Sequence, residues 1–152
     1  VRSDRLPASV IGYLDTSAFV PLLVAEPTSP ACRRFWNDAD TVVSCRLLYV
    51  EAAAALAQAE RMRRIDDIRH GQARDLLDAL WSEMDVLEID EPLARSAAAA
   101  AHDLALRGYD SVHCAAAEQL ADEDFVAASG DRRLLAAWRE CGVATYDTTL
   151  LA

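Results

Sequence analysis

Lysine is absent from this chain: all 15 basic residues are arginines, against 25 acidic residues, and the formal net charge is −10. The absence of lysine excludes a Walker A phosphate loop, a Schiff-base mechanism and any other chemistry that depends on a lysine side chain. The acidity disfavours binding of nucleic acid by bulk electrostatics, so a nuclease of this composition would need local arginine patches or metal ions beside its carboxylates. A basic protein partner fits this charge equally well.

Long apolar runs and closely spaced cysteine pairs are also missing. No stretch approaches the roughly 20 apolar residues that span a bilayer, and residues 1–9 lack the apolar centre of a signal peptide, so we expect a cytoplasmic protein. The four cysteines form no Cys-x-x-Cys motif, which favours free thiols over a zinc site or a disulfide framework. At 152 residues the chain is long enough for one folded domain. We place that domain at residues 10–152, after a flexible leader over residues 1–9.

Short β-branched runs alternate with apolar or amphipathic stretches along the whole chain. We expect strands over residues 10–14, 41–44, 86–89, 125–128 and 143–146. The intervening stretches, of which the longest are 17–24, 47–64, 66–84 and 91–106, are expected to be helical. Alternating strands and helices form parallel sheets that are covered on both faces. The expected fold class is therefore α/β, with a mostly parallel central sheet flanked by helices.

The first expected strand ends in an aspartate, Asp15, directly before a helix start. In an open parallel sheet the carboxyl ends of the strands face the ligand, so Asp15 is a candidate site residue. Its alternative role is only to cap the helix. Haloacid-dehalogenase-like phosphatases and phospho-receiver domains also place an aspartate here. Both need a lysine, and the phosphatases need a second aspartate where Ser17 stands, so both classes are excluded.

Three further carboxylates occur in comparable contexts. Glu51 is the single charge in an apolar helical run, where a buried carboxylate must pair with a core arginine or bind a metal. Asp110 opens an alanine-rich helix, which it could simply cap, and Asp131 follows an expected strand end. Carboxylates gathered at one sheet edge repel one another unless a cation lies between them. Oxygen ligands select Mg²⁺ or Mn²⁺, which suit hydrolysis of phosphodiester bonds.

The ordered set of motifs resembles the PIN-domain ribonucleases of the VapC type, the toxins of bacterial toxin–antitoxin pairs. Each motif alone is weak, but together they follow the family's order over nearly the whole chain beyond the leader. The matching stretches are Tyr13-Leu14-Asp15-Thr16-Ser17-Ala18, Glu51 in its apolar helix, Tyr109-Asp110-Ser111-Val112-His113 and Ser129-Gly130-Asp131-Arg132-Arg133-Leu134.

The resemblance implies a PIN-like three-layer sandwich and an endoribonuclease that uses Mg²⁺ or Mn²⁺ and is inhibited by a cognate antitoxin. Ser17 and Ser129 would be auxiliary residues of the site. A homodimer is also implied, and the apolar early helices favour it. The alternative is a catalytically silent PIN-like binding module whose acidic pocket receives an arginine from a partner. In the enzyme, the metal-binding and catalytic acids would be Asp15, Glu51, Asp110 and Asp131.

The arginines and histidines outside the motifs have more than one interpretation. An arginine-rich connection between the two long helices is either a solvated face or, at one or two positions, a contact for a phosphate backbone. Its members are Arg61, Arg63, Arg64, Arg69 and Arg74. The histidines lack zinc-ligand spacing, so we expect structural roles for all of them, with His113 the one that could neighbour the site. They are His70, His102 and His113.

Overall fold

Over residues 9–150, five parallel strands form one sheet, in the order β3-β2-β1-β4-β5. The computed structural model describes residues 9–150, so the leader expected over residues 1–9 lies, apart from Ser9, outside the described residues. β1 is the central strand, and Ile11 pairs with Thr41 of β2 on one side and Phe125 of β4 on the other. The strands are β1 (Ile11–Leu14), β2 (Thr41–Cys45), β3 (Asp85–Leu87), β4 (Phe125–Ser129) and β5 (Thr145–Asp147).

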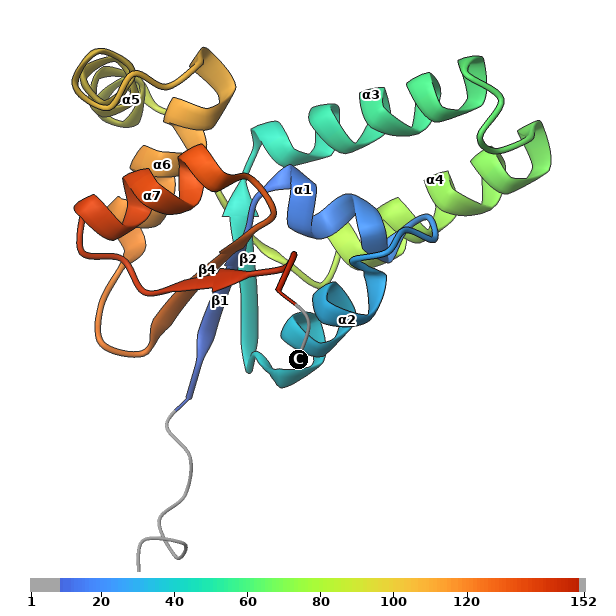
Figure 1. Cartoon of the computed structure of the whole chain (residues 1–152), viewed down its shortest axis with the longest axis horizontal. Helices are drawn as coiled ribbons and strands as arrows, with labels where there is room; N and C mark the ends of the chain where they lie inside the picture. Colours follow the sequence, from blue (N-terminus) through green and yellow to red (C-terminus); the bar gives the residue numbers. More distant parts are fainter. Residues whose placement is uncertain (1–8, 151–152) are drawn as a thin grey trace, which may run out of the picture.

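Helices cover both faces of the sheet and complete the three layers, as predicted (Figure 1). Successive side chains of β1 point to opposite faces, so Tyr13 packs into one hydrophobic core and Leu14 into the other. The core around Tyr13 is covered by α5 (Glu91–Asp103), α6 (Gly108–Leu120) and α7 (Arg132–Glu140). The core around Leu14 is covered by α1 (Thr16–Phe19), the 3₁₀ turn η2 (Val20–Leu22), α2 (Ser29–Asp38), α3 (Leu47–Arg61) and α4 (Asp67–Trp81).

The four longest expected helices all end earlier than the sequence pattern predicts, and those expected over residues 66–84 and 91–106 end at Trp81 and Asp103. The helix expected over residues 17–24 stops at Phe19 and continues as η2, where Pro21 stands in the first turn. Proline has no N–H for a helical hydrogen bond and its ring crowds the preceding turn, which explains the break. The helix expected over residues 47–64 ends at Arg61, because Arg63 adopts a left-handed backbone conformation with φ of 60°. The chain then reverses into α4, and α3 and α4 form a projecting helical hairpin (Figure 1).

Two expectations from the sequence concern membrane-spanning helices and the state of the cysteines. Over residues 9–150, no helix combines the length and apolarity that crossing a bilayer requires. The four cysteines, all within that range, are free thiols. Cys32 and Cys114 are buried and pack as small apolar side chains, whereas Cys45 is buried with its sulfur 3.8 Å from His113 Nδ1.

Candidate active site

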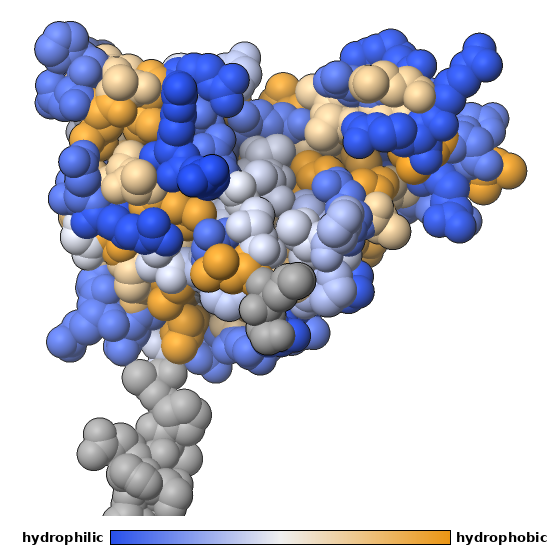
Figure 2. All heavy atoms as spheres, in the orientation of Figure 1, coloured by the Kyte–Doolittle hydropathy of each residue, from blue (hydrophilic) through white to orange (hydrophobic). Residues whose placement is uncertain are grey.

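One cavity, of about 820 Å³, brings together all four carboxylates singled out from the sequence. Asp15 comes from the end of β1, Glu51 from α3, Asp110 from α6 and Asp131 from the start of α7. The cavity opens between the lobe of α5–α7 and the α3–α4 hairpin, where the space-filling view shows a notch with a pale floor of weakly polar residues (Figure 2). The carboxyl edge of the sheet therefore collects the acids, as expected for a parallel sheet.

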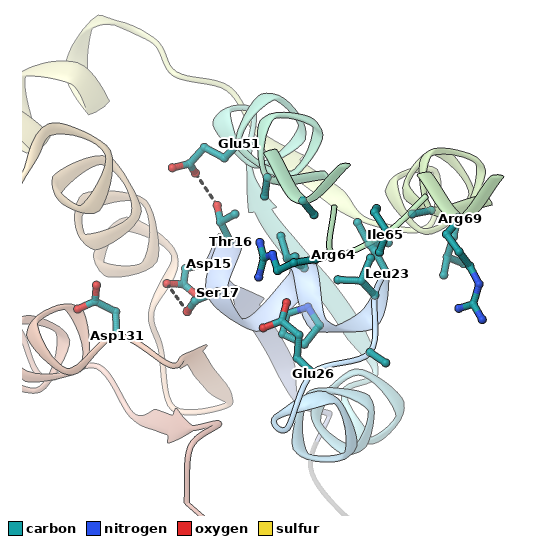
Figure 3. Close-up of a pocket in the computed structure, with 18 of the residues that line it drawn as sticks. Asp15, Thr16, Ser17, Leu23, Glu26, Glu51, Arg64, Ile65, Arg69 and Asp131 are labelled. Atoms are coloured by element: carbon teal, nitrogen blue, oxygen red, sulfur yellow. Dashed lines mark hydrogen bonds between the residues drawn. The ribbon is translucent and has the colours of Figure 1, made fainter. Parts of the chain in front are cut away.

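Asp15 is only 4% exposed, and two serines hold its carboxylate in place. Ser17 Oγ donates to Oδ1 at 2.8 Å (Figure 3), and Ser129 Oγ donates to Oδ2 at 2.7 Å. The backbone N–H of Ala18 also donates to Oδ1 at 3.0 Å, so Asp15 caps α1 as well. The two interpretations of Asp15 are thus compatible: the capping bond fixes the side chain and leaves it in the wall of the cavity.

The same serines tie the start of α1 to the loop after β4. The N–H of Gly130 donates to Ser17 Oγ at 2.8 Å, and the N–H of Asp131 donates to Ser129 Oγ at 2.9 Å. Asp131 in turn caps α7, because its Oδ1 accepts the N–H groups of Arg133 and Leu134. Ser17 and Ser129 therefore position Asp15 and Asp131 relative to each other.

Glu51 is paired with a histidine. The core arginine, one of the two partners that the sequence allowed for this carboxylate, is not the one observed. His113 Nε2 lies 2.7 Å from Glu51 Oε1, and Thr16 Oγ1 donates to the same oxygen at 2.6 Å (Figure 3 shows the bond from Thr16). On the other side of the ring, Nδ1 is hydrogen-bonded to the Tyr13 hydroxyl at 2.8 Å. Sequence reasoning did not single out Thr16. His113 lies three residues after Asp110, a spacing that puts both on one helical face and was the available signal.

Burial and like charge act on the acids of the cavity in different ways. Burial raises the pKa of Asp15, although the nearby His113 and its serine partners oppose the shift. Burial, followed by the charge of Asp131, also raises the pKa of Asp110, against the opposing effect of Arg107. For Glu51, burial would raise the pKa, but the hydrogen bonds and charge of His113 and Thr16 lower it overall. Burial lowers the pKa of His113, yet its bonds to Cys45 and Glu51 and the surrounding negative charge raise it to about 10.

The donor set fits a hard divalent cation. The cavity wall offers carboxylate oxygens, the ligands that hard divalent cations prefer. Burial raises the pKa of both Asp15 and Asp110, and the charge of Asp131 adds to the shift of Asp110, so a cation near these carboxylates would favour their ionised forms. Within residues 9–150, however, no three acidic, histidine or cysteine side chains lie close enough together to hold a metal ion as they stand. The carboxylates thus share a cavity without forming a closed cage, and a bound ion would have to draw them together.

Two arginines of the expected set, Arg64 and Arg69, line the same cavity on the side of the α3–α4 hairpin (Figure 3). Leu23 and Ile65 lie between the two arginines, and Arg64 lies on the side of the acids (Figure 3). The other three arginines of the α3–α4 connection, Arg61, Arg63 and Arg74, do not line this cavity. The cavity therefore has an acidic end, which Arg64 approaches, and a more apolar end beside Arg69.

Known proteins resemble this chain in sequence and in fold. The PIN domain family model matches residues 12–139. Ribonuclease VapC45 of Mycobacterium tuberculosis is 36% identical over 122 residues, which cover 80% of this chain and 85% of the relative. Ribonuclease VapC47 of the same species is 34% identical over 139 residues, covering 88% and 93%. The crystal structure of VapBC-5 from Mycobacterium tuberculosis, a member of the VapBC family of toxin–antitoxin systems, superimposes with a TM-score of 0.62 at 20% identity, covering 91% of this chain and 98% of that one.

The family model spans most of the chain, and the matched range includes all four acids of the cavity. This chain belongs to the PIN-domain family, within its VapC group.

Proposed function

We propose that this protein is a Mg²⁺- or Mn²⁺-dependent endoribonuclease that acts as the toxin of a type II toxin–antitoxin system. The observation that carries the proposal is that Asp15, Glu51, Asp110 and Asp131 all line one cavity at the carboxyl edge of the sheet. The relatives are named as ribonucleases, which supports the same chemistry here. The catalytically silent binding module remains the alternative.

The chain's own residues would divide the work among them. Asp15, Glu51, Asp110 and Asp131 would hold the cation, which when bound supplies an activated water and neutralises the leaving oxygen of a phosphodiester. Ser17 and Ser129 keep the Asp15 carboxylate in one orientation. Arg64 and Arg69 are placed to pair with phosphates of an RNA strand as it enters the cavity.

Removal of the metal is the direct test of this proposal. We expect the purified chain to cleave RNA in the presence of Mg²⁺ or Mn²⁺, to fall to background with excess chelator, and to recover when the ion is restored in excess. Cleavage of a labelled single-stranded RNA measures this. Cleavage that survives the chelator would refute the metal dependence. If the folded chain, loaded with metal, cleaves no RNA tested, the binding-module alternative is favoured instead.

The partner expected for this cavity is an antitoxin segment that carries an arginine beside apolar side chains. Its guanidinium would pair with two of the carboxylates, and its apolar anchors would cover the wall that includes Leu23, Ile65 and Leu76. Such an arginine occupies the space and charge that the cation needs. VapBC-5 belongs to a toxin–antitoxin family, which supports a partner of this kind.

Competition between this arginine and the cation gives a second test. Raising Mg²⁺ to about ten times its own dissociation constant should weaken inhibition by the antitoxin about tenfold. Changing the partner's arginine to alanine should release activity, whereas the same change at a partner arginine outside the cavity serves as the control. Inhibition that is indifferent to both changes would mean that the partner blocks RNA elsewhere.

The homodimer inferred from the sequence stays a proposal. Several large apolar side chains of the α3–α4 hairpin are exposed, among them Val50, Met62 and Ile68 at 64%, 60% and 67%. Exposed large apolar side chains favour association with a second surface where they form a contiguous patch.

A further inference from the structure

A buried polar chain runs behind the acidic cavity and has His113 at its centre. The histidine is 2% exposed and joins side chains from three other elements. Its Nδ1 is hydrogen-bonded to the hydroxyl of Tyr13 on β1 at 2.8 Å and lies 3.8 Å from Cys45 Sγ on β2. Its Nε2 lies 2.7 Å from Glu51 Oε1 on α3. The ring is therefore held at both nitrogens.

The anchoring of the ring extends into the core. Tyr13 is itself fully buried and meets the rings of His113 and Trp138 edge to face, each at a centroid distance of 5.9 Å. The indole Nε1 of Trp138 donates to the backbone carbonyl of His113 at 3.3 Å. Because a closely packed core allows few alternative rotamers, the direction in which Nε2 points is fixed by the fold.

Glu51 receives two donors on the same oxygen. An ionised carboxylate only accepts hydrogen bonds, so the proton at this contact belongs to His113 Nε2. Thr16 Oγ1 also donates to Oε1, at 2.6 Å. Among the described residues, the hydrogen bonds to Glu51 all fall on Oε1, which leaves Oε2 for a ligand in the cavity.

We propose that His113 is a positioning residue that fixes the Glu51 carboxylate and presents its second oxygen to the cation of the site. This inference rests on the proposed metal-dependent function. Asp110 and His113 lie on one face of α6, whereas Glu51 lies on α3. The histidine therefore ties the two helices together across the cavity and sets the position of Glu51 relative to Asp110. Partners that orient a metal ligand in this way typically change metal affinity or activity 10–100-fold when they are removed.

Two substitutions of similar polarity separate this role from simple core packing. In His113→Gln the amide nitrogen can occupy the place of Nε2 and still donate to Glu51, while the contact with Tyr13 is lost. In His113→Asn the amide can occupy the place of Nδ1 and keep Tyr13, while the contact with Glu51 is lost. His102→Asn is the control, because that side chain is 90% exposed.

The measurement is Mn²⁺ binding alone, by calorimetry, together with kcat and KM for RNA cleavage at low and saturating Mn²⁺. We expect His113→Asn to weaken Mn²⁺ binding about 10–100-fold, with kcat reduced at low Mn²⁺ and partly restored at saturation, and KM for RNA little changed. His113→Gln should restore Mn²⁺ affinity to within about threefold of wild type. A purely structural histidine would lower the stability of both variants and leave their Mn²⁺ affinity equal, and that result would overturn the inference.

Tyr13→Phe keeps the experiment decisive if His113→Asn does not fold. It removes the hydroxyl that anchors Nδ1 and preserves the shape of the ring, so we expect Mn²⁺ binding several-fold weaker than wild type. Unchanged Mn²⁺ affinity in Tyr13→Phe would overturn the inference. Failure of the proposed function is distinguishable, because the wild-type chain would then neither bind Mn²⁺ nor cleave RNA. Wild-type binding and cleavage with indifferent variants would refute the positioning role alone.

Discussion

Asp15→Asn is expected to reduce metal-dependent RNA cleavage by about 10³-fold or more while the chain stays folded. Asparagine keeps an oxygen that can accept the N–H of Ala18, so the cap of α1 survives. It loses the negative charge that the cation needs. Cleavage of labelled RNA at saturating Mg²⁺, beside far-UV circular dichroism, measures both parts. Asp75→Asn, at an exposed position of α4, is the matched control and should cleave like wild type.

The other three acids of the cavity should also be needed for RNA cleavage. Glu51→Gln and Asp110→Asn should also abolish cleavage, and Asp131→Asn should be milder, since the fourth acid of such a set often holds a weaker ion. A wild-type cleavage rate in Asp110→Asn would refute the assignment of the site.

Without metal, the melting temperatures of these variants should move in opposite directions. The folded pKa of Asp110 is raised, so its ionised form destabilises the fold at neutral pH and Asp110→Asn should raise the melting temperature. The folded pKa of Glu51 is lowered from 4.5, so its contribution is present above that pH and lost as the pH falls through the folded value. Glu51→Gln should therefore lower the melting temperature at pH 7, and the difference from wild type should shrink in acid.

Trp138→Ala is expected to have the largest effect on stability. The side chain is fully buried on α7, packs edge to face on Tyr13 and donates to the carbonyl of His113. Replacing such an aromatic residue with alanine costs about 3–5 kcal/mol, a large part of the roughly 5–15 kcal/mol that stabilises a typical domain. The melting temperature should fall by roughly 6–20 °C.

Urea and thermal unfolding measure this loss, and Trp81→Ala provides the control. Trp81 is half-buried at the end of α4, where the guanidinium of Arg46 lies 5.8 Å from its ring, so its removal should cost much less. Equal losses of stability in the two variants would contradict the prediction that Trp138 stabilises the fold more than Trp81 does.

The parts of this structure that depend on local pattern could be predicted from the sequence. Alternating strands and helices gave the parallel sheet, and aspartates after strand ends gave Asp15 and Asp131, because a parallel sheet gathers those ends at one edge. Helix ends were less predictable. The stop at Phe19 required weighing Pro21 against an apolar run, and the left-handed Arg63 has no glycine to announce it.

The partners of the acids were harder to predict than the acids themselves. The burial of Glu51 correctly required a partner, but that partner is His113, 62 residues away, and not an arginine. The contact of His113 with Tyr13 spans 100 residues. Neither pairing leaves a local periodicity, since each depends on how α3, α6 and β1 meet in the folded chain.

Because β1 is central in the sheet and comes first in the chain, the site around Asp15 can form only after residues far along the chain have been synthesised. Asp15 and Ser129, which are hydrogen-bonded at the heart of the site, are 114 residues apart in the chain. At ribosomal rates of about 5–20 residues per second, their synthesis is separated by about 6–23 s. Throughout that interval β1 lacks its neighbour β4, and the carboxylate of Asp15 lacks the serine that holds it. A nascent chain is therefore unable to assemble the proposed nuclease site until most of it has left the ribosome.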